Sequence, residues 1–101
     1  MSTLVINFSR TSLSPSAIKT AEQVIKDKVV ELFVIVRNKT IKEMADEFEK
    51  NLGNAIILPE NPVLAALLLV ELSIGQSDAF APLHPPVLEL DSRGNPVGYF
   101  E

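Results

Sequence analysis

Three short apolar runs alternate with segments of helical periodicity, and this alternation constrains the fold more than any other feature of the chain. The runs are Leu4–Phe8, Leu32–Val36 and Ala55–Leu58. Short apolar runs without polar alternation are typical of strands buried on both faces of a parallel sheet. Because parallel neighbours need crossover connections, usually helices, this order of segments predicts an α/β fold.

Each predicted helix has its own start signal. Ser14 is placed to cap the first helix, and Pro15 follows at the first helical position, where its missing N–H costs nothing. Thr40 and Glu43 have the spacing of a capping box for the second helix. The pair Asn61–Pro62 predicts the N-cap and first position of the third helix. The three signals indicate where each crossover helix begins.

The first two predicted helices are amphipathic, so one face of each should pack on the sheet. Gly53 is the expected left-handed terminator of the second helix, and Gly75 lies near the predicted end of the third. The apolar positions of the two buried faces are Ala17, Ile18, Ala21, Val24 and Ile25, followed by Ile41, Met44, Ala45, Phe48 and Leu52.

The third predicted helix is apolar on all sides over Val63–Val70. A helix of this kind is normally covered on two sides, and one small sheet covers only one of them. A second copy of the chain is the economical cover, so we expect a homodimer or a higher homo-oligomer. The run is far shorter than the ~20 residues needed to cross a bilayer, so no membrane is expected.

The C-terminal segment predicts two short strands, V-L-E-L and V-G-Y-F, around a turn at Arg93-Gly94-Asn95. Right-handed crossovers put helices on both faces of the sheet and favour the strand order second, first, third. We therefore predict one domain over residues 1–101. Its expected fold is α/β, a minimal Rossmann-like, doubly wound βαβαβαββ sheet with a parallel core and a C-terminal edge hairpin.

Composition and motifs argue against several classes of function. A chain of 101 residues, 47% of them hydrophobic, has room for one core, and its net charge of -4 with scattered basic residues disfavours long DNA or RNA as a partner. There is no cysteine, and the one histidine, His84, is interpreted as a loop residue, so no metal site is expected. No dinucleotide or P-loop motif is present, so no cofactor is expected. The N-terminus lacks a signal-peptide pattern, which predicts a cytoplasmic protein.

In an open α/β sheet, ligands bind beyond the carboxyl ends of the strands, where the strand order reverses. This rule places Asn7–Ser14 opposite Pro59–Asn61, with Arg37–Lys39 on the far side of the first strand. Hydroxyls, arginines and free N–H groups at helix starts suit an anion, and the Phe8 ring offers a face for a base. The same residue types also serve as caps, turns and core, so both interpretations stay open.

Three segments together, L-V-I-N-F-S-R-T-S-L-S-P, I-I-L-P and N-P-V-L-A-A-L-L-L-V-E-L, resemble small proteins associated with type III CRISPR systems. Such proteins are similar to minimal CARF (CRISPR-associated Rossmann) domains. The resemblance implies a cyclic oligoadenylate ligand, bound at the carboxyl ends of strands across a homodimer. The ligand-binding positions it implies are Asn7, Phe8, Ser9, Arg10 and Thr11 after the first strand and Pro59, Glu60 and Asn61 after the third; Arg37 joins them by geometry.

The function expected from this resemblance is binding of cyclic tetra-adenylate, which would damp type III CRISPR signalling by sequestration. No acid–base pair is visible in the candidate loops, so holding is favoured over cutting and no catalytic residue is assigned. One alternative is a metal-independent ring nuclease, which aligns a ribose 2′-hydroxyl with the adjacent phosphate by positioning and charge stabilisation. A second alternative is a structural protein whose apolar third helix serves assembly.

Overall fold

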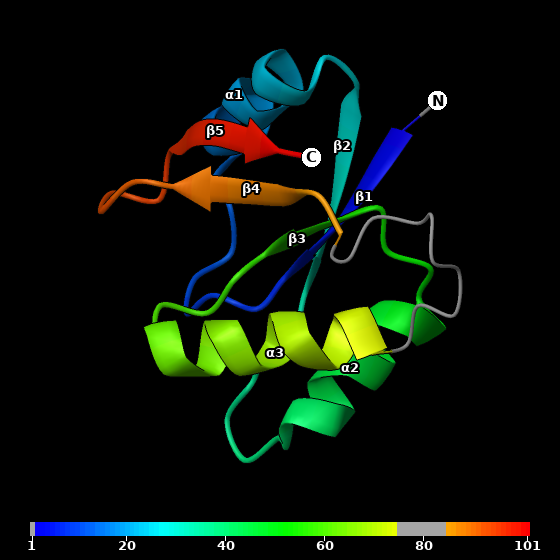
Figure 1. The fold of residues 1–101 in the computed structure, drawn as a ribbon. Coiled ribbons are helices and arrows are strands. Elements are labelled where there is room, and N and C mark those ends of the chain that lie inside the picture. The colour runs from blue at the N-terminus through cyan, green and yellow to red at the C-terminus, as the bar shows by residue number, and fades with distance from the viewer. Residues whose placement is uncertain (1, 75–84) are drawn as a thin grey trace.

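The computed structural model describes residues 2–74 and 85–101, and within these ranges five strands form one sheet flanked by three helices (Figure 1). The predicted βαβαβαββ order is confirmed. The elements are β1 (Ser2–Asn7), α1 (Pro15–Ile25), β2 (Lys28–Phe33), α2 (Ile41–Lys50), β3 (Ala55–Ile57), α3 (Pro62–Ile74), β4 (Val87–Leu90) and β5 (Pro96–Phe100).

The strands lie in the order β2-β1-β3-β4-β5. β1 pairs in parallel with both β2 and β3, β4 pairs in parallel with β3, and β5 is antiparallel to β4 at the sheet edge. The predicted order of the first three strands and the edge hairpin are therefore confirmed. The order reverses at β1, so the carboxyl ends of β1 and β3 flank the switch point.

The helices lie on both faces of the sheet, α1 on one face and α2 with α3 on the other (Figure 1). Two separate apolar cores result. Val5 of β1 belongs to the core under α1, and its neighbour Ile6 belongs to the core under α2 and α3, because successive strand side chains point to opposite faces. β1 is thus buried on both sides, as its apolar sequence predicts.

The predicted helix caps are confirmed. The Ser14 hydroxyl accepts a hydrogen bond from the Ala17 N–H at 3.1 Å. Thr40 and Glu43 form the reciprocal capping box, with hydrogen bonds of 3.1 and 2.9 Å. The Asn61 side-chain oxygen accepts two N–H groups of the first turn of α3, at 2.9 and 3.2 Å. These local signals fix the point where each chain segment leaves the carboxyl edge of the sheet.

The position of the second strand was predicted wrongly. We expected Leu32–Val36, whereas β2 runs Lys28–Phe33 and pairs along the whole length of β1. α1 ends in a left-handed residue, Lys26 (φ 64), and the chain enters the sheet two residues later, so charged residues fall inside the strand. Beyond β2, the Val34 N–H still bonds to the last carbonyl of β1 at 2.9 Å. Arg37 therefore lies several residues past the end of the strand.

The end of α2 also differs from its prediction. Leu52, expected in the buried stripe, is 82% exposed and itself takes the positive φ of 54 expected at Gly53. Gly53 serves a different purpose. A Cβ at this position would lie 2.6 Å from Ile6 Cγ1 and 2.8 Å from Phe48 Cε2. Glycine is needed here because the chain passes close against the core.

Within the part of the chain that the structure describes, α3 is covered on one side. Leu68 and Leu72 are buried against the sheet side, whereas Val63, Leu67 and Val70 are 66%, 51% and 55% exposed. The sequence prediction that one sheet cannot cover this helix is therefore matched by an exposed apolar stripe. We call Val63, Leu67 and Val70 the α3 stripe.

The edge hairpin turns at the predicted residues. Asp91 Oδ1 accepts hydrogen bonds from the Arg93 N–H and the Asn95 N–H, both at 2.9 Å. Gly94 has a φ of 83, a backbone conformation in which a residue with a side chain would be strained. The turn brings the Asp91 carboxylate to the carboxyl end of β4, beside the loop that follows β3.

Two sequence expectations, Gly75 at the end of α3 and His84 in a loop, lie outside the described residues. Over the described part of the chain, none of the helices has the length and apolar character to cross a membrane.

Candidate functional site

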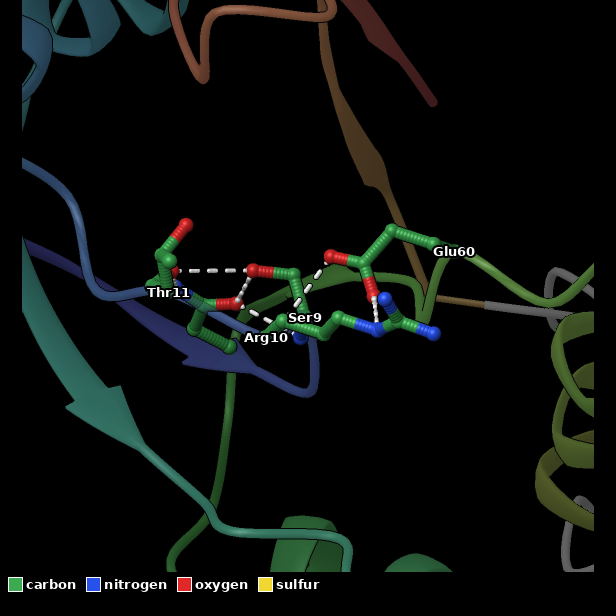
Figure 2. A network of polar contacts seen from close by, with 5 residues as sticks. Ser9, Arg10, Thr11 and Glu60 are labelled. Atoms are coloured by element: carbon green, nitrogen blue, oxygen red, sulfur yellow. Dashed lines mark hydrogen bonds and ion pairs between the residues drawn. The ribbon is translucent and has the colours of Figure 1, made fainter.

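The loops that follow β1 and β3 meet at the carboxyl edge of the sheet. The Glu60 carboxylate accepts a hydrogen bond from the Arg10 N–H at 2.8 Å and lies 3.7 Å from Arg10 Nε (Figure 2). The two side chains are 86% and 50% exposed, so this ion pair is worth only about 0–1 kcal/mol. Pro59 is buried beside them, and Asn61 uses its side-chain oxygen to cap α3. The structure thus brings the predicted first-strand and third-strand positions together.

Asn7 ends β1 and has no exposed surface. Its Nδ2 donates to Glu31 Oε2 at 2.7 Å and to the Thr11 carbonyl at 3.0 Å, and its Oδ1 accepts from the Ser9 N–H at 2.8 Å. The Ser9 hydroxyl lies 2.6 Å from the same Oδ1. Every polar atom of the Asn7 side chain is used inside the protein, so Asn7 shapes the loop and offers no donor to a ligand in this conformation.

The other predicted ligand-binding positions that follow β1 divide between the core and the surface. Phe8 has no exposed area and packs in the core under α2 and α3, so of its two interpretations the structure shows the core one. Ser9 is 6% exposed, and its hydroxyl lies 3.0 Å from the Thr11 carbonyl (Figure 2). The Arg10 and Thr11 side chains are exposed. Among the five first-strand positions, Arg10 and Thr11 are the ones that face solvent.

Glu31 in the middle of β2 is a site-shaping residue that the sequence interpretation missed. Besides Asn7, its Oε2 accepts the Leu13 N–H at 2.8 Å, so one carboxylate oxygen holds both ends of the loop after β1. The sequence signal is the single acid in V-V-E-L-F. This signal can be recognised only when β2 is known to begin at Lys28, because the predicted strand began after Glu31.

Two clefts flank the Ser9–Arg10 segment. The switch-point cleft, of about 450 Å³, lies between the loops after β1 and β3 and the edge hairpin. The second, which we call the Phe33 cleft, is about 540 Å³ and lies between the loop after β1 and the segment after β2. The switch-point cleft is lined by Ser9, Thr11, residues 57–60 and 87–92, Gly94 and Phe100, and the Phe33 cleft by Ser9, Arg10, Phe33, Ile35, Val36 and Arg37.

The switch-point cleft is acidic. Glu60, Glu89 and Asp91 line it, and among the described residues of its lining there is neither lysine nor arginine. The Asn95 N–H, followed by the other N–H groups of the hairpin turn, lowers the pKa of the Asp91 carboxyl, which is therefore ionised at neutral pH. This lining is unfavourable for a phosphate.

The Phe33 cleft has the opposite charge. Its lining includes Arg10 and Arg37, and none of the residues from the described ranges that line it is acidic. Arg37 forms no ion pair with any of the residues that the structure describes. The sequence placed Arg37 on the far side of the first strand by geometry alone, and the structure brings it into one cleft with Ser9 and Arg10. Of the two clefts, this one suits an anion.

Comparisons with protein-family models, with curated proteins and with solved structures found no match to this chain. The fold and the site define a class, a small Rossmann-like α/β protein with a polar loop cluster at the carboxyl edge of its sheet. Within the described ranges no group of histidine, aspartate and glutamate side chains is arranged to hold a metal ion. The CARF resemblance stays a prediction from the sequence.

Proposed function

We propose that this chain binds a cyclic oligoadenylate, with cyclic tetra-adenylate as the expected ligand, and that it damps type III CRISPR signalling by holding the messenger. The proposal rests on the sequence resemblance together with one structural observation. Two arginines, Arg10 and Arg37, border a single cleft at the carboxyl edge of a Rossmann-like sheet. Arginine is well suited to phosphate because its planar fork donates two parallel hydrogen bonds.

The hydrogen bonds that hold the loop after β1 support tight binding. Asn7 and Glu31 tie the backbone from Ser9 to Leu13 to the sheet through buried or partly buried hydrogen bonds. A preformed loop loses less conformational entropy when a ligand arrives, so more of the contact energy appears as affinity. The arrangement therefore favours a site built to hold its ligand.

The absence of acid–base groups in the cleft lining favours holding over cutting. No histidine, aspartate, glutamate or lysine is among the described residues that line the Phe33 cleft. The ring nuclease alternative would use Arg10 or Arg37 to stabilise the phosphate while a ribose 2′-hydroxyl attacks. Incubating the purified chain with radiolabelled cyclic tetra-adenylate and separating retained from cleaved ligand distinguishes the two; we expect intact ligand to be retained.

Assembly is the second part of the proposal. The α3 stripe exposes apolar area that water disfavours, and burial against a second copy would remove it. We expect a dimer by light scattering at micromolar concentration, and Leu67→Glu should convert it to a monomer because the introduced charge would be buried at the interface. A two-fold dimer also presents two copies of the cleft to a ligand with repeated phosphates.

The matched control for Leu67→Glu is Leu52→Glu. Leu52 is also an exposed leucine, 82% accessible, but it lies at the end of α2 and outside the α3 stripe. Leu52→Glu should leave the dimer intact. A wild-type monomer under the same conditions, or equal dissociation of both variants, would contradict assembly through α3.

A further inference from the structure

We infer that an adenine base of the ligand lies against Phe33 and Ile35 in the Phe33 cleft, with the adjoining phosphate held by Arg37; this inference rests on the proposed function. It moves the base site away from Phe8, which is fully buried, and away from the switch point between β1 and β3. The ligand class it names is an adenine nucleotide, with one aromatic base and one phosphate per cleft.

The apolar floor of the cleft follows from the way the chain leaves the sheet. Phe33 is the last residue of β2 and pairs with Asn7 at the end of β1. In the segment that follows, Val34 and Val36 pack into the core under α2 and α3, while Ile35 is 66% exposed and Phe33 is 36% exposed. Two large apolar side chains thus lie open beside the loop after β1. An aromatic ring surface is a natural base-stacking platform, because every base presents a π face.

Arg37 supplies the charge for the phosphate. It lines the same cleft as Phe33 and Ile35 and forms no ion pair with a described residue, so it is free to bind an anion. Arg10 is the second cation of the lining. Its guanidinium points to Glu60 (Figure 2), but this exposed 3.7 Å pair is weak enough for a phosphate to compete for it.

Charge favours this cleft over its neighbour, and its size suits a small ligand. Its volume of about 540 Å³ lies in the range of 300–1,000 Å³ that is usual for small-ligand sites. The switch-point cleft is of similar size, about 450 Å³, but its lining carries Glu60, Glu89 and Asp91. A nucleotide phosphate in the acidic cleft would meet like charge, whereas in the Phe33 cleft it meets arginine.

The test uses the full chain, labelled with ¹⁵N and ¹³C, and two probes, cyclic tetra-adenylate and 5′-AMP. We expect both probes to shift the amide signals of Phe33, Ile35 and Arg37, with NOEs between adenine protons and the Ile35 methyl groups. Phe33→Ala and Ile35→Ala should each weaken cyclic tetra-adenylate binding, by roughly 5- to 100-fold for the stacking ring. The matched control is Val97→Ala, an apolar residue 57% exposed on β5. Because Ile35 is mostly exposed, Ile35→Ala keeps the test valid if Phe33→Ala unfolds.

The outcomes separate this inference from the proposed function. Wild-type cyclic tetra-adenylate affinity in both Phe33→Ala and Ile35→Ala would overturn the base site and leave the proposed function standing. NOEs from 5′-AMP to Ile35 without any binding of cyclic tetra-adenylate would support the base site and overturn the proposed ligand. No perturbation of the Phe33 cleft by either probe would overturn the base site, and a complete lack of cyclic tetra-adenylate binding would overturn the proposed function as well.

Discussion

Replacing Asn7 with alanine is expected to lower the free energy of unfolding by about 3 kcal/mol. The substitution removes the partner of the buried Ser9 N–H, and it leaves the Glu31 carboxylate and the Thr11 carbonyl each with one hydrogen bond fewer. Buried polar groups left without a partner cost about 1–3 kcal/mol each, although water entering the loop recovers part of this. Chemical denaturation of the purified variant measures the loss.

The matched control is Gln23→Ala, on the exposed face of α1, which should change the free energy of unfolding by less than about 0.5 kcal/mol. A second variant, Glu31→Gln, keeps the shape of the side chain and removes its charge. It should destabilise the chain less than Asn7→Ala, because an amide oxygen still accepts the Leu13 N–H. An Asn7→Ala variant as stable as Gln23→Ala would show that the buried network does not hold the loop.

Arg37→Ala is expected to weaken cyclic tetra-adenylate binding by about 1.5–3 kcal/mol, or roughly 10- to 150-fold. The physical reason is loss of a charge-assisted hydrogen bond to phosphate. Arg10→Ala should act in the same direction, with a smaller effect because Arg10 is already paired with Glu60. Isothermal titration calorimetry at two salt concentrations gives the affinities and the electrostatic share of each.

The control arginine is Arg93, an exposed residue in the hairpin turn whose contact there is made by its backbone N–H. Arg93→Ala removes the same charge from the chain without touching the Phe33 cleft. Its ligand affinity should equal that of the wild type. If Arg10→Ala and Arg37→Ala both bind like Arg93→Ala, the phosphate contact lies elsewhere.

The fold is largely predictable from the sequence because its signals are local. Ser14, Thr40 and Asn61 each cap a helix at the residue where the sequence places the cap. The apolar β1 and β3 each end within one residue of the predicted boundary. Once these elements are known, the handedness of crossovers leaves few strand orders, and the observed β2-β1-β3 order is the expected one.

Features that depend on tertiary contacts could not be predicted in this way. The start of β2 is set by its pairing with β1, and this pairing includes Lys28 and Glu31. Because both residues are charged, their sequence does not indicate a strand. The choice between Leu52 and Gly53 for the left-handed position depends on the space beside Ile6, which no local pattern encodes. In both cases the core decides between conformations that the sequence alone leaves equivalent.

The sequence predicted which loops meet at the carboxyl edge better than it predicted the clefts beside them. The loops at Arg10 and Glu60 meet as the switch-point rule requires. The division into an acidic and a basic cleft was not predicted. Asp91 reaches the carboxyl edge of the sheet through the hairpin turn, and Phe33 lies at this edge because β2 ends earlier than predicted. Residues far apart in the chain set the charge of each cleft.

The measurement that tests the central claim most directly is the fate of cyclic tetra-adenylate at substoichiometric protein. If the chain holds the messenger, binding saturates at a fixed ratio of ligand to protein, and the intact ring is recovered after the protein is denatured. Clearance of a large excess by a trace of protein, giving linear products that end in a 2′,3′-cyclic phosphate, would contradict holding. In that case a 2′-deoxy analogue should bind and resist cleavage, because it lacks the attacking hydroxyl.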